Sequence, residues 1–415
     1  MDSGVITQQA DRHAGLGFRQ FVALVAALMA TNALAIDSML PALGKISVSL
    51  GITADNERQW VVTSYLLGFG AAQIIYGTLA DRYGRKPVIQ AALAIYVAAS
   101  LGVAFTHSFD TMMLLRVLQG LGAAGTRVLA VSVVRDCYEG RRMARVMSLS
   151  FLVFLGVPVL APSIGQLIML AFPWRGIFVA LGLYGALILL WISRRLPETL
   201  NPADRRPIEF AGILAAARIT LTNRVSVGYT LAMSLVLGGL FGFINSAQQV
   251  FTSVFHDARF FPLIFAVIAG AIAVASLLNA RLVGRVGSRA ISHAALFGFI
   301  AIAAIHAGVA LSGHETIWSF AILQSAMMFC FGLMVGNFGA MAMEPLGHIA
   351  GSAASIQGCF STLASALVGF FIGQNFNGTV VPLTLGFAVC SLAALGVVFV
   401  AERGRLFQPQ HPRTS

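Results

Sequence analysis

The sequence predicts an all-α integral membrane protein with twelve transmembrane helices arranged as two six-helix halves. Its 415 residues are 58% hydrophobic and only 10% charged, whereas soluble domains average about 45–50% apolar and 25% charged residues. The apolar residues gather in twelve continuous stretches, and a membrane-spanning helix needs roughly 20 such residues. Transmembrane β-strands would alternate apolar and polar positions, so we expect helices. The stretches are centred near Val25, Phe69, Ile95, Ala123, Pro158, Gly185, Leu235, Ile268, Ala301, Phe329, Ala366 and Leu392.

The distribution of positive charge orients these spans. If the N-terminus is cytoplasmic, 21 of the 27 Lys and Arg residues fall in cytoplasmic segments and two fall inside the membrane. The opposite side then holds only Lys45, Arg58, Arg175 and Arg259. Such a bias is the positive-inside rule, and it predicts that both termini are cytoplasmic. It also explains the net charge of +11 without a nucleic-acid partner.

Proline and charge divide the chain into five segments. We expect a cytoplasmic tail (1–17), an N-terminal half (18–195), a cytoplasmic central loop (196–222), a C-terminal half (223–402) and a second tail (403–415). A weak internal repeat supports two halves, because LADRYGRK and LVGRVGSR begin 203 residues apart (282 − 79 = 203). Parallel repeats of this kind relate the halves of many transporters.

The sequence indicates no cofactor site. Its four cysteines lack the paired spacing of a metal site or a disulfide framework, and no phosphate-binding loop of the GxxxxGK[ST] type occurs. They are expected to be buried thiols: Cys137, Cys330, Cys359 and Cys390. The segment Met1 to Gln20 carries acidic residues and lacks the apolar region of a signal peptide.

Asp37 is the acidic residue of the first expected span. It follows Phe21 to Ile36, a stretch that is apolar apart from Thr31 and Asn32. An ionised carboxylate near the membrane centre costs at least ~2.5 kcal/mol, so a buried carboxyl group can take up and release a proton. The functional interpretation is proton coupling. The alternative is that Asp37 caps the outer end of the span, as Pro41 four residues later would allow.

Arg116 and Arg127 lie in the fourth expected span. Eleven residues are close to three helical turns, so both side chains should share one face. Buried arginines need partners, and the face that carries them should line a cavity or the bundle interior. For both residues the alternative is structural pairing with carbonyl groups or polar side chains.

The fifth expected span carries Pro158, Pro162 and Gly165. Prolines remove backbone donors and kink a helix, and glycine lets a neighbouring helix approach closely. The span could serve as a contact on which the two halves rock. A general packing kink is the alternative.

The segment GTLADRYGRKP, which begins at Gly77, concentrates charge between two apolar stretches. Asp81 could bind arginines or the positive N-terminus of the next helix, and Gly84 would allow a tight turn. Together with Arg82 and Arg85, these residues predict a conformational gate at the cytoplasmic face. A cluster that only sets topology is a compatible alternative.

Further polar residues are expected at the cavity or the gate. Glu344 could be a second proton-coupling group, part of an inner gate or a solvated loop residue. A larger set of polar side chains at membrane depth is expected to line the substrate cavity: Asn32, Tyr65, Arg127, Asn245, Gln324, Asn337 and Gln357.

These motifs together resemble the major facilitator superfamily, and within it the Bcr/CflA-type drug:proton antiporters. The resemblance rests on Ala35–Leu43 (AIDSMLPAL), Gly77–Pro87, the Arg116/Gln119/Gly120 set, Pro162 with Gly165, and Met343–Gly358. Some related exporters carry a second acid two turns before the Asp of the first helix. Met29 occupies that place here, so coupling through two acids in this helix is not expected.

The resemblance implies a secondary transporter of the bacterial cytoplasmic membrane. It would export small amphipathic or lipophilic compounds, such as drugs, in exchange for protons by alternating access. Asp37, Arg116 and Glu344 would serve proton coupling, and a proton gradient would replace any cofactor. We expect a monomer in the lipid bilayer. The alternatives are a proton-coupled uptake symporter for a small polar metabolite and an integral-membrane enzyme.

Overall fold

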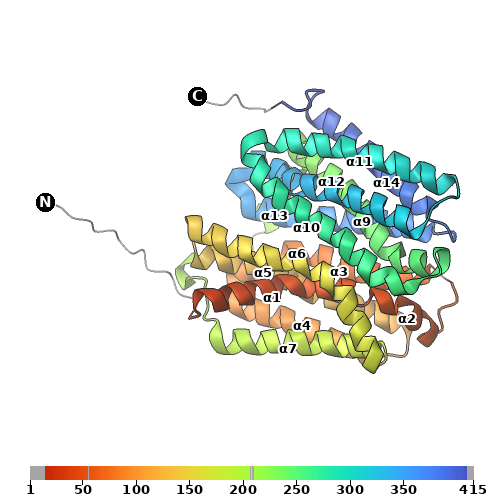
Figure 1. Ribbon diagram of the computed structural model, residues 1–415. Coiled ribbons are helices and arrows are strands. Elements are labelled where there is room, and N and C mark those ends of the chain that lie inside the picture. Colours follow the sequence, from red (N-terminus) through yellow and green to blue (C-terminus); the bar gives the residue numbers. More distant parts are fainter. Residues whose placement is uncertain (1–14, 55, 206, 208–209, 409–415) are drawn as a thin grey trace.

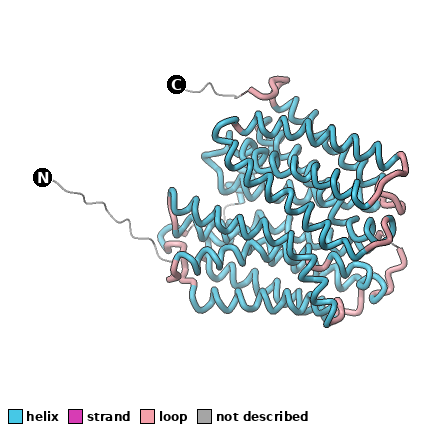
Figure 2. The backbone as a smooth tube through the Cα atoms, in the orientation of Figure 1, coloured by secondary structure: helices cyan, strands magenta, loops and turns pink. Residues whose placement is uncertain are grey.

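The computed structural model describes residues 15–54, 56–205, 207 and 210–408. Within this part of the chain all regular structure is helical (Figure 2). Twelve long helices are present: α1 (Phe18–Asp37), α3 (Trp60–Tyr83), α4 (Arg85–Phe105), α5 (Phe109–Cys137), α6 (Gly140–Ala171), α7 (Arg175–Arg195), α9 (Arg224–Gln249), α10 (Phe261–Val286), α11 (Ser288–Leu311), α12 (Ile317–Met343), α13 (Ala350–Gln374) and α14 (Val381–Ala401). They confirm the predicted fold class.

Length and hydropathy alone separate only eleven spans in the described residues, because Ile317–Gln374 runs on as one 58-residue helical segment. The short helix η6 (Glu344–Ile349) joins α12 to α13 within it, and the backbone leaves helical geometry at Leu346. Pro345, at the start of η6, lacks the N–H that would continue the helix. Two spans therefore meet at this turn, as the sequence predicted.

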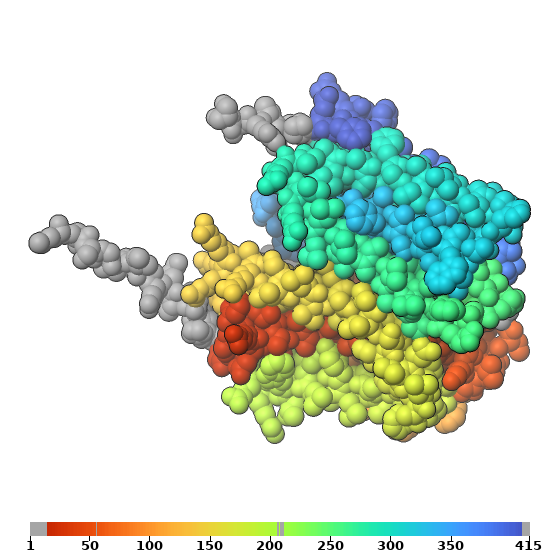
Figure 3. Space-filling view, in the orientation of Figure 1, coloured from red at the N-terminus to blue at the C-terminus, as the bar shows by residue number. Residues whose placement is uncertain are grey.

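The long helices form two bundles that lie one above the other in Figure 1, α1–α7 below and α9–α14 above. Figure 3 shows them in contact along a single seam. Because the spans alternate in direction, α1 begins and α14 ends on the same side. We call this the terminal side and the other the far side.

Two short helices were not predicted. α8 (Phe210–Thr222) has 13 residues and lies in the segment expected to be a loop. It is shorter than the roughly 20 residues of a span, so it adds no crossing. α2 (Leu43–Ser49) and the 3₁₀ turn η1 (Leu40–Ala42) follow α1 on the far side. Pro41 opens that turn and interrupts the helical path after Asp37.

Small residues bring α3 and α5 into backbone contact. A Cβ atom on Gly120 of α5 would lie 2.0 Å from the Tyr65 carbonyl oxygen, and one on Gly68 of α3 would lie 2.0 Å from the Val117 carbonyl oxygen. Membrane helices associate through such close packing because lipid supplies no hydrophobic driving force between them. The two glycines therefore fix the frame of the N-terminal half.

The seam is closed on the far side by amide groups. Asn56 Nδ2 donates to the Gln374 carbonyl at 2.9 Å, and Gln59 Nε2 donates to Gln249 Oε1 at 2.8 Å. Arg58 donates to Gln248 Oε1 at 3.0 Å. These contacts join the turn before α3 to the ends of α9 and α13, so the halves meet here.

We expect Gly120→Ala to destabilise the bundle by about 1–3 kcal/mol, because the new methyl group has no space beside the Tyr65 carbonyl. The melting temperature of the purified protein measures this. Gly308→Ala in α11 is the matched control, since no atom lies within 4 Å of its added Cβ. Equal melting temperatures for the two variants would contradict the close-packing argument.

Candidate functional site

A cavity of about 540 Å³ opens between the halves on the terminal side. The ends of α3 and α5 and the beginning of α13 enclose it, together with residues of η6, α8 and the segment before α8. Its polar lining includes Asp81, Arg85, Arg135, Asp136 and Asp204. The predicted gate segment therefore borders a space between the two halves.

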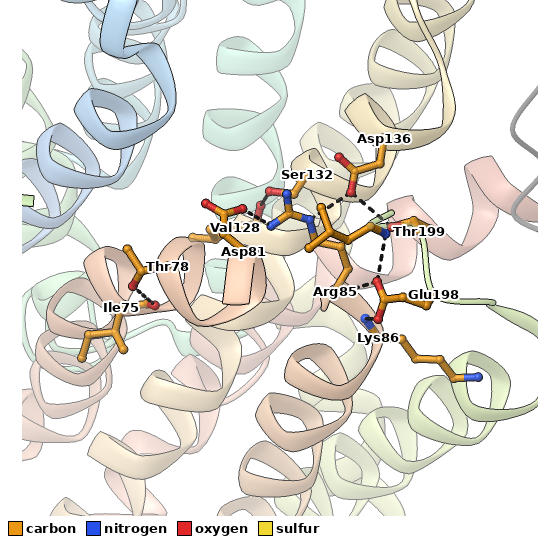
Figure 4. A network of polar contacts seen from close by, with 11 residues as sticks. Ile75, Thr78, Asp81, Arg85, Lys86, Val128, Ser132, Asp136, Glu198 and Thr199 are labelled. Atoms are coloured by element: carbon orange, nitrogen blue, oxygen red, sulfur yellow. Dashed lines mark hydrogen bonds and ion pairs between the residues drawn. The ribbon is translucent and has the colours of Figure 1, made fainter. Parts of the chain in front are cut away.

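Arg85 is the centre of a charge network at this cavity (Figure 4). Its side chain is 3% exposed and pairs with Asp81 Oδ1 at 2.6 Å and Asp136 Oδ2 at 2.9 Å. Thr199 Oγ1 also donates to Asp136 Oδ2, at 3.2 Å. The buried guanidinium is thus held by carboxylates from α3 and α5, which makes its burial tolerable.

Glu198 caps the next helix. Its carboxylate accepts the backbone N–H groups of Arg85 at 2.8 Å and Lys86 at 3.1 Å, the first N–H groups of α4. A carboxylate is stabilising at this positive end of a helix. Gly84 has φ +100°, and a Cβ there would lie within 2.3 Å of a Glu198 oxygen. The sequence left Asp81 two possible partners, an arginine or the N-terminus of the next helix. In the structure Asp81 pairs with Arg85, and Glu198 takes the helix N-terminus.

The other gate residues occupy different positions. Gly77 lines the cavity, where its Cβ position is 3.6 Å from Ser355 Oγ of α13. Arg82 lies outside the carboxylate network, with its guanidinium 5.5 Å from the centre of the Tyr83 ring.

The C-terminal half repeats this arrangement. Gly287, 203 residues after Gly84 (287 − 84 = 203), also has positive φ, at +92°. Arg289, which corresponds to Lys86 by the same offset (289 − 203 = 86), pairs with Glu344 Oε2 at 2.8 Å and Glu402 Oε1 at 2.9 Å. Glu344 thus lies in a terminal-side ion pair, whereas Asp37 lies at the far-side end of α1. The structure does not bring these two acids together.

Asp37 is the last residue of α1 and is 5% exposed. Within the described residues no hydrogen bond or ion pair involves its carboxyl group. The turn that follows touches α6: a Cβ on Gly165 would lie 1.7 Å from the Ser38 carbonyl oxygen. Pro162 is buried one turn earlier, and Pro158 is half-buried. The predicted α6 motif therefore packs beside the acid.

Arg116 is fully buried inside the N-terminal half. Nε donates to the Val61 carbonyl at 2.8 Å, and Nη1 donates to the Ala35 carbonyl at 3.2 Å and to Gln119 Oε1 at 2.5 Å. The Tyr65 ring lies 4.6 Å from its Cζ. Arg116 therefore ties α5 to α3 and to the end of α1, two residues before Asp37.

Arg127 lies in a different environment from Arg116. Its side chain is exposed, and its Cζ is 5.8 Å from the centre of the Phe69 ring. Tyr65 Oη, in the same cluster, donates to Asn32 Oδ1 at 3.0 Å. The structure thus groups Asn32, Tyr65 and Arg127 outside the lining of the cavity of about 540 Å³. Their role as substrate-cavity residues stays a prediction.

The four predicted polar residues of the C-terminal half fall into two groups. Asn337 bonds Asn279 at 2.9 Å, and Gln357 bonds Ser226 at 2.8 Å, so both act within the packed bundle. Asn245 and Gln324 are fully buried, and their amide groups lack partners within the described residues. Unpaired buried amides are rare in stable cores.

Within the described residues no group of three or more His, Cys, Asp or Glu side chains could hold a metal ion.

Comparison with known proteins identifies the family. A family model of the Major Facilitator Superfamily matches residues 22–369. The Bicyclomycin resistance protein homolog of Haemophilus influenzae is 26% identical over 377 residues, 89% of this chain and 92% of the relative. The Chloramphenicol resistance protein of Pseudomonas aeruginosa is 29% identical over 394 residues, 91% of this chain and 90% of the relative.

The solved structure of a D-xylose-proton symporter superposes with a TM-score of 0.70 at 13% identity, over 94% of this chain and 98% of that one. The chain belongs to the major facilitator superfamily. It is a multi-pass membrane protein and a secondary transporter rather than an enzyme, so the alternative of an integral-membrane enzyme is overturned. Its resistance-protein relatives confirm the resemblance to Bcr/CflA-type drug transporters.

We expect Asp136→Asn to destabilise the protein more than Asp81→Asn. Asp136 is 14% exposed and also accepts from Thr199, whereas Asp81 is 43% exposed. Hydrogen bonds to charged groups contribute about 1.5–3 kcal/mol when buried, and exposed ion pairs contribute less than about 1 kcal/mol. Melting temperatures of the purified variants test the order.

Asp257→Asn is the control for this comparison. Its hydrogen bond with Arg259 lowers the pKa of Asp257, but that arginine is 88% exposed. We expect almost no change in stability. If Asp81→Asn lowers the melting temperature more than Asp136→Asn does, the more buried carboxylate is not the more stabilising one, and the prediction is wrong.

Proposed function

We propose that this chain exports small amphipathic or lipophilic compounds in exchange for protons, by alternating access across the bacterial cytoplasmic membrane. Two relatives named for resistance to bicyclomycin and chloramphenicol support export of such compounds. The membrane acid Asp37 supports coupling to protons. The protein is expected to work as a monomer, with halves 18–195 and 223–402 moving as units.

The charge bias supports a cytoplasmic position for the terminal side and both termini. Of the 27 Lys and Arg residues, 21 would then be cytoplasmic and four would be on the opposite face. The cavity of about 540 Å³ would open to the cytoplasm, and the amide contacts of Asn56 and Gln59 would close the periplasmic side. An exporter loads its cargo in this state.

The observation that carries the proposal is the buried, unpartnered carboxyl group of Asp37. An ionised carboxylate is costly at such a place, and a protonated one is far less so. Its protonation state therefore changes the energy of the turn that packs against Gly165 of α6. Because α6 also contacts the other half through α10, a change at this turn can reach the seam.

We assign Arg116 a positioning role in proton coupling. It holds the Ala35 carbonyl in place and so supports the end of α1 that carries Asp37. The networks around Arg85 and Arg289 would serve the gate by holding the cytoplasmic helix ends of each half rigid, because their ion pairs lie within one half. Glu344 belongs to the second of these networks.

Asp37→Asn is expected to abolish proton-driven efflux, because an amide cannot exchange a proton. Substrate binding should persist, since Asn resembles the neutral acid. Efflux of antibiotics and dyes from everted vesicles, with collapse of the pH gradient, measures this. Asp110→Asn, at an exposed position in the first turn of α5, should behave as wild type.

Active efflux at the wild-type rate by Asp37→Asn would disprove its role as proton carrier. Substrate accumulation driven by inward proton flow, in place of efflux, would favour the alternative of an uptake symporter.

Arg116→Lys is expected to lower the melting temperature and to impair efflux. Lysine lacks the planar fork that reaches the Val61 and Ala35 carbonyls together, and an unpaired buried acceptor costs about 1–3 kcal/mol. With the end of α1 less supported, the pH midpoint of substrate binding should also shift. A weakened protein with an unshifted midpoint would limit Arg116 to a structural role.

A further inference from the structure

Arg127 carries a charge at membrane depth that the protein itself does not neutralise. No hydrogen bond or ion pair joins its guanidinium to another described residue, although it makes a cation–π contact with the Phe69 ring. Arg116, on the same helix, has acceptors on α1, α3 and α5. A guanidinium has five N–H donors and stays charged, so those of Arg127 need acceptors from outside the protein.

The exposed side chain of Arg127 lies on the face of α5 that leads to the cavity between the halves. Residues four apart lie on one face of a helix, and Val131 and Arg135, which continue this face toward the terminal side, are also exposed. Arg135 lines the cavity of about 540 Å³. The exposed Leu114 and Leu118 of α5 lie on a different face. Arg127 is therefore reached from the cavity side of α5.

A second free donor lies in the same cluster. Asn32 of α1 uses its Oδ1 to accept a hydrogen bond from Tyr65 Oη. This contact leaves the N–H groups of its Nδ2 available to donate. Within the described residues Nδ2 donates to no other group, and the residue is partly exposed. The Tyr65 and Phe69 rings stack at 6.2 Å and connect Asn32 to Arg127. One charged donor and one neutral donor thus border the same space.

We propose that Asn32 and Arg127 form a subsite for the carboxylate of an amphipathic organic anion, which would be a preferred class of cargo. The planar guanidinium matches a carboxylate with two parallel hydrogen bonds, and one positive charge balances one negative charge. The exposed Val131 supplies apolar surface beside it. This inference rests on the proposed function, because it assumes that cargo enters this cavity.

The test uses the full chain in nanodiscs of phosphatidylcholine, which carry no anionic lipid. Three probes share one aromatic body and differ in charge: naphthoate, naphthamide and naphthylmethylammonium. We expect the wild type to bind naphthoate about tenfold more tightly than naphthamide, and the ammonium probe least tightly. Arg127→Gln should remove the preference for naphthoate and leave the affinity for naphthamide within about twofold.

Two further variants separate charge recognition from structure. Arg127→Lys keeps the charge but not the fork, so it should retain part of the naphthoate preference. Arg141→Gln removes the same charge from the exposed beginning of α6 and should retain all of it. Melting temperatures show whether each variant is folded. A wild type without a naphthoate preference, or an Arg127→Gln variant that keeps it, would overturn the subsite.

This outcome is distinguishable from failure of the proposed function. Arg127-dependent binding of naphthoate without proton-driven transport would leave the subsite in place and overturn the proposed exchange. Proton-driven efflux of neutral and cationic compounds without any preference for the carboxylate would support the proposed exchange and overturn the subsite.

Discussion

A charge placed inside a membrane bundle must find a partner in the protein, and the frame of this transporter follows from that constraint. Arg116 bonds carbonyl groups of α1 and α3 as well as Gln119 of its own helix, so three helices are held around one guanidinium. Arg85 joins α4 to carboxylates of α3 and α5, and Arg289 does the same for two acids of the other half. The satisfied charges are therefore structural.

Two membrane-depth groups depart from this rule, and both lie in the N-terminal half. Within the described residues, the buried carboxyl group of Asp37 has no hydrogen-bond or ion-pair partner, and the accessible guanidinium of Arg127 has only a cation–π contact with Phe69. A fold that gives Arg116 three acceptors yet leaves these two groups free keeps them available for exchange with a proton and with a cargo. This difference, rather than depth in the membrane, separates structural from functional charges.

The spans and the repeat could be predicted from sequence because they depend on local pattern. Continuous apolar runs located all twelve long helices, and the 203-residue offset located Gly287, whose φ matches that of Gly84. Partners distant in sequence could not be predicted: Glu198 lies 113 residues from the Arg85 amide that it caps. Likewise Asn245 and Asn337 look alike in sequence, and only the fold gives a partner to one of them.

The two sides of the seam are held by different chemistry, and this difference suits alternating access. On the far side, hydrogen bonds such as Gln59 to Gln249 run between the halves and involve mostly neutral amides. Water can replace such bonds at small net cost when the seam opens. The ion pairs of Arg85 and of Arg289 each lie within one half. The halves can therefore separate on either side while these charges keep their partners. The far-side contacts that must break when the halves move are hydrogen bonds that water can replace.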